Sequence, residues 1–167
     1  VSSLQVRPAR YITAGTLQVD GALGNTAVSV ANNATLAGGG SIAGTVTVAD
    51  GGTLQGHSGQ TLSTGALMLG SSSNVNVALG TPSSTALFQV NGALTLEGQV
   101  NVTDFGGFSP GVYRLMNYTG GLTDNGLLIP NGDEPALTAA LAELLDHRDL
   151  ADRLRKSAAQ DAMRFSS

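Results

Sequence analysis

Hydrophobic and polar residues alternate in short bursts through the first three quarters of the chain. The bursts are Leu17-Gln18-Val19, Val28-Ser29-Val30, Val46-Thr47-Val48, Leu67-Met68-Leu69, Val75-Asn76-Val77-Ala78-Leu79, Leu94-Thr95-Leu96 and Val100-Asn101-Val102. Because the alternation has a period of two residues, one face of each burst points inward and the other points toward water. The pattern therefore predicts many short β-strands, with the Val and Leu residues of the bursts in the core and the Gln, Ser, Thr and Asn residues between them outside.

Clusters of turn-forming residues separate these predicted strands. They are Asp20-Gly21, Gly38-Gly39-Gly40, Asp50-Gly51-Gly52, Gly70-Ser71-Ser72-Ser73 and Asn91-Gly92. Gly, Asn and Asp accept the backbone angles that tight connections need. We therefore expect the chain to change direction at each cluster.

Equivalent residues recur at a nearly constant interval. Thr-Leu pairs start at Thr16, Thr35 and Thr53, in steps of 19 and 18 residues, with Ala27-Val28 and Thr45-Val46 about halfway between them. A unit of about 18–20 residues with two or more short strands is typical of a solenoid coil. We expect Gly15–Gly126 to form about five or six coils of a parallel β-helix with an aliphatic rather than aromatic interior. The alternative is an antiparallel sandwich joined by Asp-Gly and Asn-Gly hairpins. The solenoid is favoured because the same residue types recur in register.

The composition changes near Ile129. Of the 23 glycines only Gly132 lies beyond that point, and the charged residues number eight before it and twelve after it. Two modules are therefore expected: a β-solenoid over residues 1–128 and a charged tail over residues 129–167. In the tail Asp133 and Asp146 are suited to cap helices, and leucines such as Leu137 and Leu141 form an apolar stripe. The predicted fold is mainly β, with a C-terminal α-helical hairpin that packs against the last coils.

Composition and charge exclude several kinds of site. The chain has no cysteine, which rules out disulfides and thiolate metal sites. Its net charge of −4 and its few Lys and Arg residues argue against nucleic acid as a partner. His57 and His147 are the only histidines and lie in different modules, so no metal site is expected.

Candidate catalytic motifs are explained better as turns. Gly38-x-Gly40-x-x-Ala43 resembles a dinucleotide fingerprint but leads into a predicted strand, so it lacks the helix N-terminus that would hold a pyrophosphate. His57-Ser58 lacks the spacing of a nucleophile motif and has no acid near it in the sequence. The carboxylates that could pair across coils for glycoside chemistry are Asp20, Asp50, Glu97, Asp104 and Asp124. Asp20 and Asp50 each precede glycine, which favours a role in turns. We expect no catalytic, cofactor-binding or metal-binding residues.

Several segments resemble a known family. Ala14–Gly21 is similar to the autotransporter-associated β-strand repeat, although Thr13 replaces the usual Ser and Val1–Ile12 replaces the segment that normally precedes it. Further matching runs are Leu54–Leu62, Ala86–Val90, Gly106–Leu115 and Leu122–Leu127. Over Gly15–Leu128 the chain thus resembles the C-terminal part of a bacterial autotransporter passenger. This resemblance implies a right-handed β-helix that is secreted or displayed on the bacterial surface, often as an adhesin or virulence factor. It also implies a stable segment that supports passenger folding and export through a translocator β-barrel.

The tail carries a different resemblance. Asn125–Asp133 and Arg164-Phe165-Ser166 are similar to the C-terminal end of retaining GT-B glycosyltransferases, but Ser167 stands where Trp is usual. The donor-binding motif of that family lies upstream of this segment and is absent here, so no catalytic residue carries over.

Together these observations predict a non-enzymatic structural and binding segment of a surface-exposed or secreted bacterial protein. The expected partners are a host-surface or carbohydrate ligand, the translocator barrel of the parent protein, and other copies of the chain through the solenoid edges. The alternatives are a fragment of a β-helical carbohydrate-active enzyme, or an inactive glycosyltransferase remnant fused to a solenoid.

Overall fold

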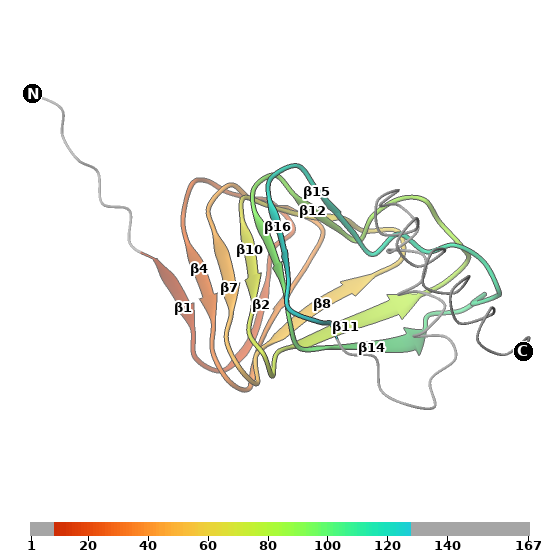
Figure 1. The fold of residues 1–167 in the computed structure, drawn as a ribbon, viewed down its shortest axis with the longest axis horizontal. Coiled ribbons are helices and arrows are strands. Elements are labelled where there is room, and N and C mark those ends of the chain that lie inside the picture. Colours follow the sequence, from red (N-terminus) through yellow and green to blue (C-terminus); the bar gives the residue numbers. More distant parts are fainter. Residues whose placement is uncertain (1–8, 128–167) are drawn as a thin grey trace, which may run out of the picture.

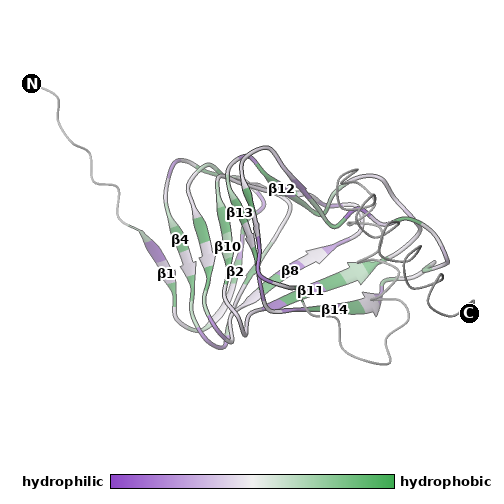
Figure 2. Ribbon diagram, viewed as in Figure 1, coloured by the Kyte–Doolittle hydropathy of each residue, from purple (hydrophilic) through white to green (hydrophobic). Residues whose placement is uncertain are grey.

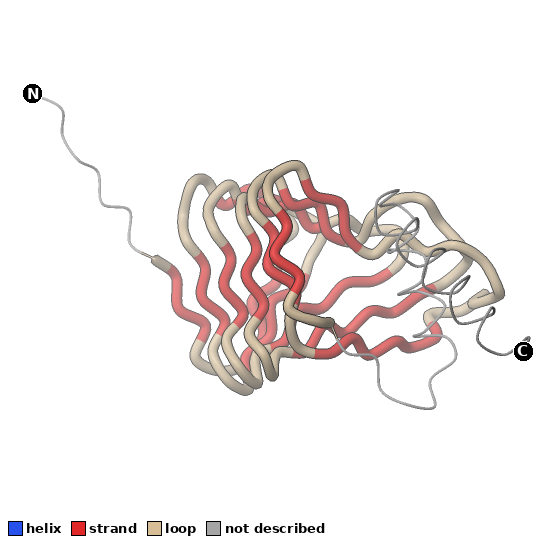
Figure 3. Tube along the Cα trace, viewed as in Figure 1, coloured by secondary structure: helices blue, strands red, loops and turns tan. Residues whose placement is uncertain are grey.

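The computed structural model describes residues 9–127, which fold into a parallel β-solenoid of about five coils (Figure 1). The described residues contain strands and loops but no helix (Figure 3). The strands form three parallel sheets. Sheet A comprises β1 (Arg10–Ile12), β4 (Val28–Val30), β7 (Val46–Val48), β10 (Leu67–Leu69), β13 (Leu94–Leu96) and β16 (Leu122–Asp124). Sheet B comprises β2 (Gly15–Gln18), β5 (Ala34–Ala37), β8 (Thr53–His57), β11 (Asn74–Leu79) and β14 (Gln99–Asp104). Sheet C comprises β3 (Ala22–Leu23), β6 (Ser41–Ile42), β9 (Leu62–Thr64), β12 (Phe88–Val90) and β15 (Met116–Tyr118).

Each strand pairs with its counterparts in the neighbouring coils, and every pairing is parallel. Thr16 pairs with Thr35, and Thr35 pairs with Thr53. The Thr-Leu pairs that defined the predicted repeat therefore lie in register in successive coils. Parallel pairing requires a crossover between partner strands. The hairpin-linked sandwich is therefore wrong, and the solenoid is confirmed. The stack also begins earlier than Gly15, because Arg10–Ile12 forms the first strand of sheet A.

The coils become longer along the chain. Successive pairings in sheet A join Arg10 to Val28, Val28 to Val46, Val46 to Leu67, Leu67 to Leu94 and Leu94 to Leu122, which gives coils of 18, 18, 21, 27 and 28 residues. The predicted period of about 18–20 residues therefore fits the first coils only.

The added length lies mainly at one corner of the coil, between sheets B and C. The connection has three residues after β2 (19–21) and β5 (38–40), four after β8 (58–61), eight after β11 (80–87) and eleven after β14 (105–115). The other two corners keep two to four residues in every coil. We call residues 80–87 and 105–115 the corner loops.

The core runs along the inside of the coils. Of the residues that alternation placed inside, all are buried except Leu17 and Val102, which are half-buried in terminal strands of sheet B. Hydrophobic segments of stacked strands lie side by side in Figure 2. The predicted solvent face is also confirmed in orientation, since Gln18 is exposed and Ser29, Thr47, Asn76, Thr95 and Asn101 are half-buried.

The expectation of a purely aliphatic interior is wrong for the long coils. Phe88 and Tyr113 are the largest fully enclosed side chains, at 0% and 2% exposure. A wider cross-section leaves more interior volume, and protein cores are packed without large voids. Gly56 contributes to this packing: a methyl group there would lie 2.7 Å from the tip of the Phe88 ring.

One corner is lined by stacked glycines. Gly44, Gly65, Gly92 and Gly120 follow the strands of sheet C in successive coils. A Cβ atom would lie 2.2 Å from the Thr26 carbonyl oxygen at Gly44, and 2.5 Å from the Gly92 carbonyl oxygen at Gly120. Glycine is therefore required for the coils to approach closely at this corner. The predicted helical hairpin and the remainder of the tail lie outside the described residues.

Candidate ligand-binding corner

The two corner loops lie side by side at the wide edge of the solenoid (Figure 1). Ser83 and Tyr113 form an isolated parallel bridge between them. The Ser83 amide donates to the Val112 carbonyl at 3.1 Å, and the Arg114 amide donates to the Ser83 carbonyl at 3.0 Å. The loops thus continue the cross-coil pairing outside the named strands.

The Tyr113 side chain braces both loops. Its hydroxyl accepts a hydrogen bond from the Ser109 amide at 3.1 Å. The same hydroxyl lies 3.0 Å from the Gly80 carbonyl oxygen and 2.8 Å from the Ser109 carbonyl oxygen, and donates its proton between them. Phe108 stacks on the Tyr113 ring with centroids 5.1 Å apart. These contacts fix the long loops to the core.

An exposed aromatic ring lies beside this braced region. Phe105 is 57% exposed and stacks on His57, with ring centroids 5.1 Å apart and planes 23° apart. The Phe105 amide donates to the Leu79 carbonyl at 2.8 Å, and the next turn is closed by the Gly106 amide, which donates to the Asp104 carboxylate at 2.7 Å. The ring is therefore held by a fixed backbone. Sequence analysis did not single out Phe105, because its neighbour His57 is two strands away in sheet B.

The outer face of sheet B carries amide side chains along the strands that lead to this pair. Gln99 Nε2 donates to Asn74 Oδ1 at 2.7 Å, and Asn101 Nδ2 donates to Asn76 Oδ1 at 2.9 Å. Each bond joins residues that are in register on β11 and β14. Such ladders orient the amides and leave other donors and acceptors directed toward solvent. The face therefore offers uncharged hydrogen-bonding groups along the strands that lead to the aromatic ring.

The carboxylates considered for catalysis serve as hydrogen-bond acceptors. Their donors are Gln18 for Asp20, Ser71 and Ser72 for Asp50, Asn125 for Glu97, Gly106 for Asp104 and Gly126 for Asp124. Most of these bonds close a local turn or join the turns of adjacent coils. Within residues 9–127 no group of three or more His, Asp or Glu side chains could hold a metal ion.

Of the two sequence motifs that resembled catalytic sites, Gly38–Gly40 is a turn, as expected, whereas His57 belongs to a strand and only Ser58 lies in the turn that follows. Gly38–Gly40 connects β5 to β6, and the chain continues as a strand. His57 ends β8, and its Nδ1 atom lies 3.1 Å from the Ser58 carbonyl oxygen. The Ser58 hydroxyl accepts a hydrogen bond from the Gly80 amide at 2.8 Å, so it ties adjacent coils together.

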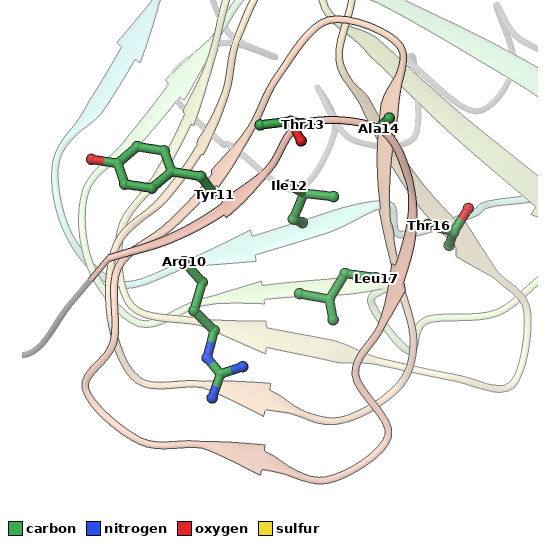
Figure 4. A pocket seen from close by; sticks show the side chains of 7 residues that line it. All are labelled: Arg10, Tyr11, Ile12, Thr13, Ala14, Thr16 and Leu17. Carbon is green, nitrogen blue, oxygen red and sulfur yellow. The ribbon is translucent and has the colours of Figure 1, made fainter.

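A hollow of about 430 Å³ lies at the N-terminal end of the solenoid. Figure 4 shows Ile12 and Leu17 pointing into the coil, and Tyr11 and Thr16 pointing away from it. Ile12 and Leu17 are half-buried, whereas the residues stacked beneath them, Val30 and Leu36, are fully buried. Among the described residues, the hollow is therefore the exposed first coil of the core rather than an enclosed ligand pocket.

The described fold defines a class: a parallel β-solenoid with a mainly aliphatic core and uncharged outer sheet faces. Among residues 9–127 no helix is long and apolar enough to cross a membrane. A curated protein with a similar segment is the Adhesin BmaC autotransporter of Brucella suis biovar 1 (strain 1330). The two are 46% identical over 63 residues, which is 35% of this chain and 2% of that protein. The chain therefore spans only a small part of the length of the relative it matches. No protein-family model matches the chain, and no solved structure matches it.

The partial match and the solenoid fold both fit the passenger of an autotransporter, and they support a passenger-type surface protein. The resemblance drawn over Gly15–Leu128 is thus supported at this coarser level. None of these comparisons supports the glycosyltransferase resemblance of the tail, and residues 129–167 lie outside the described structure.

Proposed function

We propose that the chain is a structural and binding segment of the passenger of a bacterial autotransporter of the adhesin type. The observation that carries this proposal is the 46% identity to a segment of an autotransporter adhesin, in a chain whose described part is a β-solenoid. The proposed location is the bacterial surface or the secreted fraction, with a translocator β-barrel as a partner in the parent protein. We also propose a right-handed coil, because parallel strands are joined by right-handed crossovers in nearly all sheets.

The proposed role in export rests on the local nature of solenoid folding. In a solenoid each coil contacts only its neighbours, so one well-packed region can nucleate the rest. The long coils are suited to this role, because they contain Phe88 and Tyr113 in the core and a braced pair of loops. A region of this kind would fold early and oppose return of the chain through the membrane.

The proposed binding surface is the Phe105–His57 pair together with the amide ladders of sheet B. A carbohydrate or host-surface ligand fits this surface, since sugar C–H groups pack on aromatic rings and hydroxyl groups pair with amides. The ring is fixed before any ligand arrives, which lowers the entropic cost of binding. We propose a non-enzymatic function, in support of which the five candidate carboxylates are engaged in turns.

Export is tested by placing the full chain before a translocator barrel in a bacterial host. Surface display is measured by protease accessibility on intact cells. We expect the natural chain to be displayed, Val48→Asp to reduce display strongly, and Thr47→Asp to leave it nearly unchanged. A chain that folds but remains in the periplasm would contradict the passenger role.

Binding is tested separately with the purified chain on an array of neutral, sialylated and sulfated oligosaccharides and on immobilised host-matrix proteins. Phe105→Ala should remove most of any retained signal. Tyr11→Ala is the matched control, because Tyr11 is 74% exposed but lies on the first coil, away from the corner. A signal that Phe105→Ala does not change would place the ligand elsewhere. Hydrolysis of the same oligosaccharides would overturn the non-enzymatic proposal.

A further inference from the structure

The outward face of sheet B supplies neutral hydrogen-bonding groups. Among the described residues its outward positions hold Thr, Gln, Asn, Ala and one His, with no Asp, Glu, Lys or Arg. Neutral amides and hydroxyls pair well with the hydroxyl groups of a ligand. They do not form the charge-assisted bonds with which Arg and Lys bind carboxylate or sulfate groups. The face is therefore suited to a neutral ligand.

The described basic residues lie on other elements than the strands of the Phe105–His57 pair. Within residues 9–127 they are Arg10 and Arg114. Arg10 belongs to β1 in the first coil of sheet A. Arg114 lies near the end of its corner loop, shortly before β15 of sheet C, whereas Phe105 directly follows β14 of sheet B. No described Arg or Lys thus belongs to the strands that carry the two rings.

The charge that adjoins Phe105 in the chain is negative. Asp104 is exposed, and its Oδ1 atom accepts the amide of Gly106, the residue after Phe105, at 2.7 Å. This hydrogen bond holds the carboxylate against the short backbone segment that carries the ring. Charges act over about 8 Å at physiological ionic strength, so a ligand charge near the ring is within reach of this carboxylate. An anionic group there is repelled, whereas a neutral group is not.

We propose that the Phe105–His57 pair and the adjoining face of sheet B bind neutral sugars, and that Asp104 is a specificity-determining residue that disfavours sialylated and sulfated ones. This inference rests on the proposed binding surface and names the class of ligand that it accepts. The ring and the amides supply the attraction. The carboxylate supplies the repulsive element that discrimination between similar ligands often requires.

The test uses the full chain and pairs of oligosaccharides that share one neutral core, with and without a terminal sialic acid or sulfate. Retention is measured in a mildly alkaline buffer, in which histidine side chains are uncharged. The natural chain should retain the neutral member of each pair better than the anionic member. Asp104→Asn keeps an oxygen that can accept the Gly106 amide but removes the charge. It should raise retention of the anionic members about threefold to tenfold and leave the neutral members unchanged.

The matched control is Asp124→Asn, which makes the same change of charge in a similar turn. The Asp124 carboxylate accepts the Gly126 amide at 3.0 Å. Its neighbour Asn125 donates to Glu97, which precedes β14, so the length of β14 separates this turn from Phe105. The control should leave the ratio of anionic to neutral retention unchanged.

A second measurement needs no variant and remains decisive if Asp104→Asn fails to fold, which circular dichroism would show. At 1 M salt the screening length falls to about 3 Å, so repulsion by Asp104 should be largely removed. Retention of the anionic members by the natural chain should therefore rise with added salt, while retention of the neutral members should not. A fall in anionic retention would indicate attraction to a basic group and would overturn the inference.

The two proposals fail in different ways. The inference alone is overturned if Phe105→Ala abolishes retention but the natural chain retains anionic members as well as neutral ones. It is also overturned if a folded Asp104→Asn variant leaves the ratio unchanged. If no oligosaccharide is retained, or if Phe105→Ala has no effect on retention, the proposed binding surface itself is wrong and this inference is overturned with it.

Discussion

The first two coils and the last two coils follow one plan with different dimensions. The first two contain 18 residues each, and the last two contain 27 and 28. Sheet A has three-residue strands throughout, and the corners on either side of it change little. The additional residues of the last two coils lie in the longer strands of sheet B and in the corner loops. A solenoid can therefore widen on one edge while the rest of the stack keeps its register.

The two regions also fill their interiors differently. The narrow coils use aliphatic residues such as Val30, Leu36 and Ile42, whereas the wide coils add Phe88 and Tyr113. Wider coils need larger side chains, because empty interior space forfeits packing contacts. The same widening provides the exposed Phe105–His57 pair. The narrow region is thus mainly a scaffold, and the wide region is the candidate site of recognition.

The largest expected effect is in the narrow region, where a charge cannot be accommodated. Val48 is fully buried in β7, so Val48→Asp should lower the free energy of unfolding by about 3–5 kcal/mol. Thr47→Asp, on the outward face of the same strand, should cost little. Denaturant unfolding of both variants measures the difference. Equal effects would contradict the assigned faces of the strand.

The glycine corner tests whether the two regions share a constant element. Gly44→Ala in a narrow coil and Gly120→Ala in a wide coil should each cost about 1–3 kcal/mol, because the added methyl meets backbone atoms of the adjacent coil. Gly121→Ala is the control, since nothing lies within 4 Å of its Cβ position. If Gly120→Ala lowered the free energy of unfolding as little as the control while Gly44→Ala lowered it substantially, the two regions would not share this close approach of the coils.

The Tyr113 hydroxyl should matter only to the wide region. Tyr113→Phe removes its hydrogen bonds to Gly80 and Ser109 and should cost about 1–2 kcal/mol. Amide hydrogen exchange, measured residue by residue, should show lost protection in the corner loops. Protection in β4 and β7 should be unchanged. Uniform loss over all coils would mean that the two regions unfold as one unit.

The smallest expected effect is a gain in stability at the step between the two regions. Thr64 is 2% exposed in β9, and its hydroxyl has no hydrogen-bond partner among the described residues. Its neighbours in register are Ile42 and Val90, so Thr64→Val should raise the free energy of unfolding by about 1 kcal/mol. The control is Thr95→Val on an outward face, which should change little. A loss of stability at Thr64 would show that its hydroxyl is satisfied in solution.

Only part of the candidate site was accessible from sequence. The turn roles of Gly38–Gly40 and Ser58 were predicted correctly, because local residue types decide whether a segment turns, whereas His57 lies in the preceding strand. The Phe105–His57 pair was missed, since contact between residues two strands apart depends on how long each intervening coil is. The division at residue 128, the helical hairpin and the absence of catalytic residues stay predictions.

The sequence by itself determined the strands, their inward faces and the register of the first coils. Alternation decides which side of a strand is buried, and a constant period brings like residues into the same column. Tertiary structure decided the widening, the buried aromatic residues, the bracing of the corner loops and the stacking of Phe105 on His57. These features depend on how the coils stack. A connection between strands can have any length that still brings the next strand into register with its counterpart in the previous coil. Only the folded structure shows which side chains of adjacent coils then come into contact.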